Sequence, residues 1–299
     1  MSSFHGILPA VVTPVDERED FRPDSFRDLL ASVYAAGVHG IYVCGQTGEG
    51  LQQSEAQRMR VAEAAVEHSP AGAQVIIHVG AFSTREATAL ARHASSAGAA
   101  AVSALPPFGA YSFAEIKAYY QAIAEASTVP VLVYYFTPLS GAISHLEQLL
   151  ELCALPNVAG LKFTDSDMYK LNELVRSGAT VFNGSDEMLS AGLLRGAHGG
   201  IGSIYNLIPE KFVEMYSLAQ AGRWTEASAL QDRINDLIRI ILRYPVFPAV
   251  KTLLRWSGID CGPCLRPRRD LTPEEAADLR RRVAATEYAA RFHCQGGAA

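Results

Sequence analysis

The sequence predicts a (β/α)₈ barrel followed by a C-terminal helical extension. Eight short apolar runs alternate with amphipathic segments from residue 7 to about residue 220. Most of these runs are continuously apolar, which is typical of parallel strands covered on both faces. The length of 299 residues fits one α/β barrel of about 250 residues with an extension, as well as two domains of about 150 residues.

The eight expected strands are short and are bounded by turn residues. They are Ile7–Thr13, Gly40–Cys44, Gln74–Gly80, Ala100–Pro106, Val131–Phe136, Val158–Thr164, Thr180–Ser185 and Gly199–Tyr205. A doubly wound sheet is the alternative. It is disfavoured because Thr13-Pro14-Val15-Asp16 follows the first strand, where that fold carries a glycine-rich fingerprint.

Amphipathic segments between the strands predict helices over residues 24–36, 54–68, 84–97, 113–126, 144–154, 167–177, 187–195 and 209–221. Helix-start signals stand at Ser54 and Ser83, and Ser112 with Glu115 forms a capping-box pattern. Three further helices are expected without any strand, over residues 223–241, 247–257 and 273–289. We therefore place the barrel at residues 1–221 and the helical extension, packed on it as one structural unit, at residues 222–299.

Composition and charge exclude several classes of function. The net charge of −5 and the lack of a basic stripe argue against nucleic-acid binding. No apolar run reaches the ~18 residues of a membrane span, and no signal peptide is visible. Five scattered cysteines are then expected to be reduced thiols of a cytoplasmic protein.

The segment Cys261-Gly262-Pro263-Cys264 has the spacing of a thioredoxin redox motif. That motif works where a strand precedes it and a helix begins at the first cysteine, which lowers the thiol pKa. Here a helical run precedes it and Leu265-Arg266-Pro267 follows. We expect a proline-rich surface loop, with a thiol oxidoreductase as a remote alternative.

Lys162 is the strongest candidate for chemistry. The chain has five lysines, and Lys162 is the one that falls in a predicted strand. Burial removes water from the charged amine, lowers its pKa and leaves part of it neutral, as a Schiff-base nucleophile requires. The alternative is a salt-bridged or snorkelling lysine at a strand end.

Other polar residues gather at the predicted carboxyl ends of the strands, where barrel active sites lie. The second strand ends in a glycine-rich turn, Gly45–Gly50, whose N–H groups and Thr47 hydroxyl suit an anion. Taken singly, Tyr135 is more often a core residue, and the pair Asp186-Glu187 a helix start. Their convergence with Lys162 on one end of the barrel favours a shared site.

These residues resemble the N-acetylneuraminate lyase and dihydrodipicolinate synthase superfamily of class I, Schiff-base aldolases. The resemblance runs from about Gly6 to Leu271, and three segments carry it: Gly45–Glu49, Tyr135-x-x-Pro138 and Gly160–Thr164. It implies a barrel with C-terminal helices, a homotetramer built as a dimer of dimers, and a small 2-keto acid or sugar acid as substrate. No metal and no organic cofactor are implied, because the lysine itself forms the covalent intermediate.

The resemblance also implies roles for individual residues. Lys162 would form the Schiff base, and Tyr135 would transfer the proton. Thr47 would hold the pyruvate carboxylate, and the adjacent Gln46 would also bind the substrate. Hydroxyl groups of a sugar would be bound by residues after the sixth, seventh and eighth strands, namely Thr164, Gly184, Asp186, Glu187 and Ser203. These residues are those of the branch that cleaves N-acetylneuraminate to pyruvate and N-acetylmannosamine.

Several features distinguish the sequence from its relatives, among them Phe136, which stands where these lyases often carry Asn or His. No arginine follows Pro138 to grip a dicarboxylate, which disfavours 4-hydroxy-tetrahydrodipicolinate synthase. Gln46 stands where a serine or threonine usually contacts the catalytic tyrosine, and the segment after Pro138 is one residue short. An aldolase or dehydratase for another 2-keto-3-deoxy sugar acid therefore stays open, as does a catalytically silent sugar-binding protein.

Overall fold

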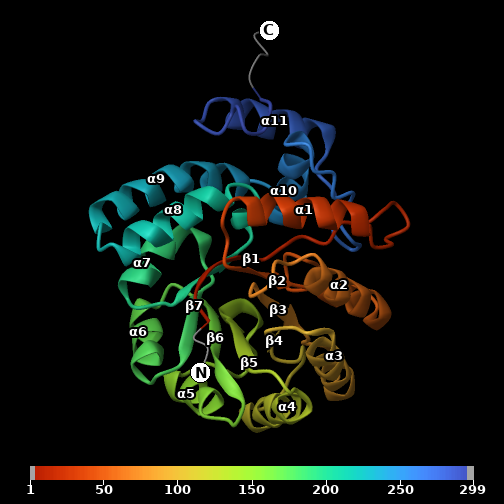
Figure 1. Cartoon of the computed structure of the whole chain (residues 1–299), viewed down its shortest axis with the longest axis vertical. Coiled ribbons are helices and arrows are strands. Elements are labelled where there is room, and N and C mark those ends of the chain that lie inside the picture. The colour runs from red at the N-terminus through yellow and green to blue at the C-terminus, as the bar shows by residue number, and fades with distance from the viewer. Residues whose placement is uncertain (1–3, 295–299) are drawn as a thin grey trace.

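The computed structural model describes residues 4–294 of the chain and confirms the barrel. Eight parallel strands are paired in the order β1-β8-β7-β6-β5-β4-β3-β2 (Figure 1). A parallel bridge between Ala10 and Tyr42 joins the first strand to the second and closes the ring. The strands are β1 (Gly6–Pro9), β2 (Gly40–Val43), β3 (Gln74–His78), β4 (Ala101–Ala104), β5 (Val131–Phe136), β6 (Val158–Thr164), β7 (Thr180–Asn183) and β8 (Gly199–Gly202).

A helix follows each strand and covers the outside of the barrel (Figure 1). The predicted caps are confirmed: Ser54 and Ser83 each accept a backbone N–H, and Ser112 forms the complete capping box with Glu115. The barrel helices are α1 (Pro23–Ala35), α2 (Glu55–Glu67), α3 (Thr84–Ala97), α4 (Phe113–Ala126), α5 (Leu146–Cys153), α6 (Met168–Arg176), α7 (Leu189–Leu194) and α8 (Pro209–Gln220).

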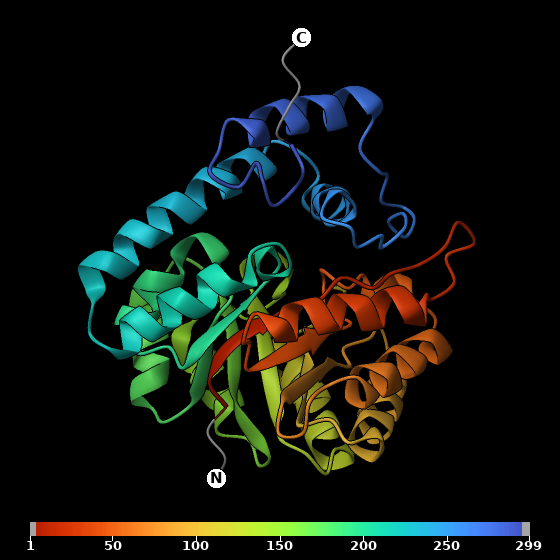
Figure 2. The ribbon, with the colours of Figure 1, turned by 45° about the horizontal axis from the view of Figure 1, so that its top comes forward.

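Three more helices form the C-terminal part of the chain: α9 (Trp224–Ile241), α10 (Val246–Trp256) and α11 (Pro273–Ala284). Helix α9 packs against α7 and α8, and α10 packs against α9 and the turn after β8. Figure 2 shows these helices above the end of the barrel at which the strands finish. Residues from this segment therefore border the site.

Apolar side chains are divided between two clusters. One cluster fills the barrel interior and includes Leu8, Tyr42, Leu132, Tyr134 and Phe182. The larger cluster lies between the strands and the surrounding helices. Alternate residues of one strand thus belong to different clusters, because successive side chains of a strand point to opposite faces.

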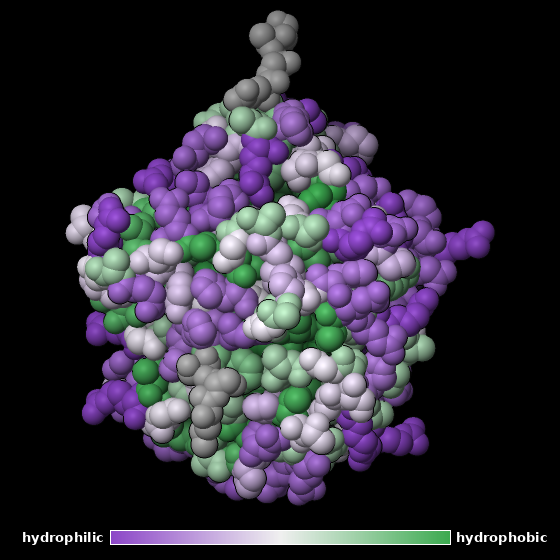
Figure 3. All heavy atoms as spheres, viewed as in Figure 1, coloured by the Kyte–Doolittle hydropathy of each residue, from purple (hydrophilic) through white to green (hydrophobic). Residues whose placement is uncertain are grey.

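The surface is of ordinary polarity. On the side drawn in Figure 1, hydrophilic side chains predominate, and hydrophobic ones gather in the lower centre of the view (Figure 3). An apolar cavity of about 690 Å³ lies at the opposite end of the barrel from the site, bordered by Pro130, Val158 and Thr180 before or at the start of their strands. Within residues 4–294, no helix is long and apolar enough to cross a membrane.

Candidate active site

Lys162 lies in the middle of the barrel, on β6, and is 5% exposed. Its Nζ atom stands 4.1 Å from the centre of the Tyr134 ring and 4.8 Å from that of Tyr42. No carboxylate of the described residues comes within 4.0 Å of the amine, so the salt-bridged alternative does not apply. Burial lowers the pKa of Lys162 to about 7, and the charge of Asp186 opposes this shift. A sizeable fraction of the amine is therefore neutral near pH 7.

Tyr134, not Tyr135, faces Lys162, which corrects the prediction from the sequence. In the register between β5 and β6, Tyr134 is paired with Lys162, and Tyr135 with Phe163. The Tyr134 ring belongs to the interior cluster. Tyr135 lies in the cluster outside the barrel, where its ring stacks on Phe163 at 5.5 Å and its hydroxyl donates to Asp165 Oδ2 at 3.4 Å.

The sequence does not identify Tyr134 as the inward-facing tyrosine for a simple reason. The run Val131–Phe136 is apolar throughout, so no alternation in the sequence tells which of two adjacent tyrosines points inward. One signal was available, because the segment after Pro138 is one residue short when Tyr135 is matched to the family tyrosine. Matching Tyr134 instead lengthens the distance to Gly141 by one residue and removes this deficit.

Five of the residues predicted to bind substrate line one cavity of about 140 Å³ at the carboxyl end of the strands. They are Thr164, Gly184, Asp186, Glu187 and Ser203. The remaining wall comes from residues that sequence reasoning missed, among them Ile238, Ile241 and Val246 of the C-terminal part. A cavity with hydroxyl and carboxylate groups on one wall and aliphatic groups on the other suits a polyol with an apolar backbone.

The carboxylate of Asp186 is held by the loop after β8. Its Oδ2 accepts the N–H of Ile204 at 2.8 Å, and its Oδ1 is buried without a partner. Burial raises the pKa of Asp186 to about 7, although the hydrogen bond from the Ile204 N–H lowers this pKa. The free oxygen is available to a hydroxyl donor from a ligand.

Thr47 is joined to this wall by a hydrogen bond of 2.6 Å between its hydroxyl and that of Ser203. The Oγ1 atom of Thr164 is buried without a hydrogen bond, and its proximity moderates the strong rise that burial causes in the pKa of Tyr134. Thr47, Thr164 and Ser203 therefore present hydroxyls from three different strand ends. Gln46 differs from the prediction: its side chain lines a neighbouring cavity with Phe136, not the one around Asp186.

Glycines leave room for these groups. A β-carbon on Gly184 would lie 2.0 Å from Thr164 Oγ1, and one on Gly202 would lie 1.8 Å from Asp186 Oδ1. Both distances are far below van der Waals contact. Glycine at these two strand ends lets the polar side chains approach the backbone.

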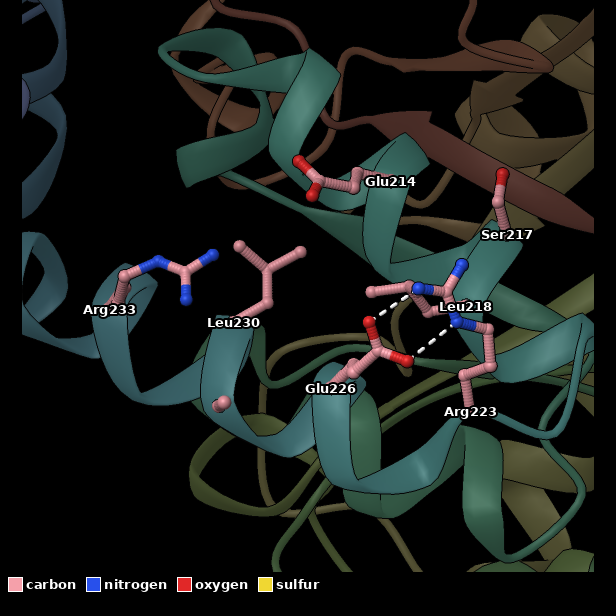
Figure 4. A pocket seen from close by; sticks show the side chains of 8 residues that line it. Glu214, Ser217, Leu218, Arg223, Glu226, Leu230 and Arg233 are labelled. Atoms are coloured by element: carbon pink, nitrogen blue, oxygen red, sulfur yellow. Dashed lines mark hydrogen bonds and ion pairs between the residues drawn. The ribbon is translucent and has the colours of Figure 1, made fainter.

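Two other features do not belong to the site. The groove of about 410 Å³ between α8 and α9 lies on the outside, where Arg223 and Glu226 are bound to each other by two hydrogen bonds (Figure 4). Cys261 and Cys264 lie in a loop as expected, but both are buried, so the expectation of a surface loop is wrong. Burial raises the pKa of Cys261 to about 12, which disfavours the thiolate that redox chemistry needs.

Comparison with known proteins agrees with this arrangement. A sequence profile of the dihydrodipicolinate synthetase family matches residues 3–286. The chain is 36% identical to N-acetylneuraminate lyase of Rhizobium meliloti over 93% of this chain and 94% of that one. It is 37% identical to the lyase of Citrobacter koseri over 88% and 90% of the two chains. The structure of N-acetylneuraminate lyase from Proteus mirabilis superposes with a TM-score of 0.89 at 29% identity, covering 96% of this chain and all of that one.

Proposed function

The chain belongs to the dihydrodipicolinate synthetase family, and we propose that it is a Schiff-base aldolase that cleaves N-acetylneuraminate to pyruvate and N-acetylmannosamine. The observation that carries this proposal is the buried, unpaired amine of Lys162 facing Tyr134 below a wall of hydroxyl and carboxylate groups. The similar enzymes of Rhizobium meliloti and Citrobacter koseri are named as lyases of this substrate. A covalent lysine intermediate requires neither a metal nor an organic cofactor.

The reaction begins when the neutral amine of Lys162 attacks the C2 carbonyl of the open-chain sugar acid. Loss of water leaves an iminium, whose positive charge accepts the electron pair released when the C3–C4 bond breaks. The resulting enamine is protonated at C3, and water then hydrolyses the imine to give pyruvate and free lysine. In this proposal, Thr47 and the N–H groups of its turn hold the pyruvate carboxylate.

Tyr134 takes the proton of the C4 hydroxyl in this proposal. Burial raises the pKa of Tyr134 strongly, with a smaller opposite effect from the Thr164 hydroxyl. A phenol of that kind becomes a base only beside a positive charge, which the iminium on Lys162 supplies. The sugar hydroxyls are bound by four residues that line one cavity with Gly184, namely Thr164, Asp186, Glu187 and Ser203. A substrate that lacks a matching hydroxyl would leave a buried polar group of the protein without a partner.

The chain is proposed to act as a homotetramer, as its family resemblance implies. Exposed aromatic side chains support a subunit contact after β3 and β4: Phe82 is 60% exposed and touches Phe108, and Tyr111 is 37% exposed. Large exposed rings on one face are typical of protein interfaces. Sedimentation velocity of the wild type and of Phe82→Glu tests this, and a monomeric wild type would contradict it.

The direct test of the activity is the release of pyruvate from N-acetylneuraminate, with Lys162→Ala as the control. Borohydride reduction in the presence of pyruvate should add its mass to the wild type and leave Lys162→Ala unchanged. Borohydride labelling without cleavage of N-acetylneuraminate would keep the Schiff base and reject this sugar. No labelling of folded protein would favour a silent binding protein.

A further inference from the structure

A second cavity, of about 650 Å³, lies beside the proposed sugar cavity and is used by no step described above. Gln46 and Gln52 border it on the barrel side, together with Phe136 at the end of β5. The segments 245–248 and 267–269 close it from the C-terminal part of the chain. Val246 lines both cavities, so the two share a wall at the mouth of the site.

Arg268 is the charged group of this cavity that lacks a counter-ion. Its guanidinium forms no ion pair and no hydrogen bond with residues 4–294, and its Nε is buried without an acceptor. The guanidinium instead lies 4.6 Å from the centre of the Phe247 ring. The guanidinium group carries a positive charge, and a buried donor without an acceptor is unfavourable.

Nearby arginines show that this lack of a partner is specific to Arg268. Arg266 is bound to Glu19 at 2.6 Å. Arg269, which also borders the cavity, is held by both carboxylate oxygens of Glu275. The local carboxylates are therefore already occupied, and the positive charge of Arg268 remains available to an anion from outside the chain.

Two neutral donors stand at the same cavity. The side-chain amides of Gln46 and Gln52 make no hydrogen bond within the described part of the chain, although each can donate two. The adjoining sugar cavity has the opposite character, because Asp186 and Glu187 line it and repel negative charge. An anionic group at the site mouth is thus favoured on the Arg268 side only.

We propose that Arg268, with Gln46 and Gln52, forms a subsite for a second anionic group, a phosphate ester at the end of the substrate far from the keto carbon. This inference rests on the proposed function, in which Thr47 already binds the carboxylate beside the keto group. Guanidinium binds phosphate through two parallel hydrogen bonds, and the Phe247 ring holds its plane. The subsite extends the substrate class to phosphorylated 2-keto-3-deoxy sugar acids.

The test compares N-acetylneuraminate 9-phosphate with N-acetylneuraminate in the wild type, Arg268→Gln and the control Arg266→Gln. We expect Arg268→Gln to lower the ratio of kcat/KM for the phosphorylated over the plain substrate by about tenfold or more, as expected for loss of a charge-assisted hydrogen bond. Arg266→Gln should leave that ratio unchanged. An equal effect of Arg268→Gln on both substrates would overturn the proposal. A 2-keto-3-deoxyaldarate, which ends in a carboxylate, serves as the third substrate. A higher kcat/KM for this substrate than for the phosphate ester would show that the Arg268 subsite does not select a phosphate ester.

A binding measurement separates this proposal from the proposed function. Isothermal titration of inorganic phosphate into the unreacted protein should show binding that Arg268→Gln weakens by about tenfold or more and Arg266→Gln does not. Such a result supports the subsite even if N-acetylneuraminate proves not to be cleaved. Phosphate binding that is absent, or is equal in the wild type and Arg268→Gln, would reject the subsite even if cleavage is observed.

Discussion

Lys251 on α10 and Glu49 in the turn after β2 form an ion pair of 3.2 Å, with the two side chains 2% and 1% exposed. Lys251 also donates to the carbonyl of Pro263 at 2.6 Å, and Glu49 accepts the N–H of Leu265. The turn that carries Thr47 is thereby tied to the C-terminal part of the chain. Glu49 itself has a left-handed backbone, with φ of 53°, which these contacts hold in place.

This pair predicts a large effect of Glu49→Gln on stability. The substitution leaves the ammonium of Lys251 buried without a negative partner, which typically costs about 3–5 kcal/mol. The free energy of unfolding in urea measures the loss, and KM for N-acetylneuraminate should rise because the Thr47 turn loosens. Glu151→Gln is the control, because it removes a solvent-exposed pair with Lys117 worth about 0–1 kcal/mol. Similar small losses in both variants would show that the buried pair is not needed.

The two adjacent tyrosines provide the sharpest test of the mechanism. Tyr134→Phe removes the hydroxyl of the ring that faces Lys162, and we expect kcat to fall by about 10²–10⁴-fold. Tyr135→Phe removes only a long hydrogen bond to Asp165 outside the barrel, and kcat should change little. Borohydride trapping of pyruvate should persist in both variants, since the amine is intact. The reverse order of the two kcat values would restore Tyr135 as the proton-transfer residue.

The difference between these tyrosines marks the limit of sequence reasoning for this chain. The barrel could be predicted because turn residues and helix caps punctuate the sequence, and Lys162 because a lysine in an apolar strand is unusual. The residues of β5 that point into the barrel could not be predicted, because a strand covered on both faces shows no alternation of polar and apolar residues. Ile238, Val246 and Arg268 could not be placed either, because they reach the site from helices and a loop far along the chain.

Glycine at the end of β8 predicts a selective defect. In Gly202→Ala the added methyl would lie 1.8 Å from Asp186 Oδ1 and 2.7 Å from the Tyr205 ring, so the carboxylate must leave its present position in the sugar cavity. We expect KM for N-acetylneuraminate to rise by about tenfold, the cost of one hydrogen bond to a charged group. Pyruvate contacts no atom of this carboxylate in the proposed mechanism, so its trapping by borohydride should be retained. Loss of trapping together with cleavage would indicate that the barrel itself is disturbed.

The pKa of Lys162 predicts how trapping depends on pH. Burial lowers this pKa to about 7, so the neutral amine and the rate of Schiff-base formation should rise through pH 7, well below the range of an ordinary lysine. The charge of Asp186 raises the pKa of Lys162 against this effect. Asp186→Asn removes that charge, and the midpoint of the trapping rate should therefore move to lower pH. The measurement is the initial rate of borohydride-dependent mass addition between pH 5 and pH 10, in steps of ~0.5 pH units. A midpoint that moves upward would mean that Asp186 does not act on Lys162 through its charge, and one near pH 10 in the wild type would mean that the amine is hydrated.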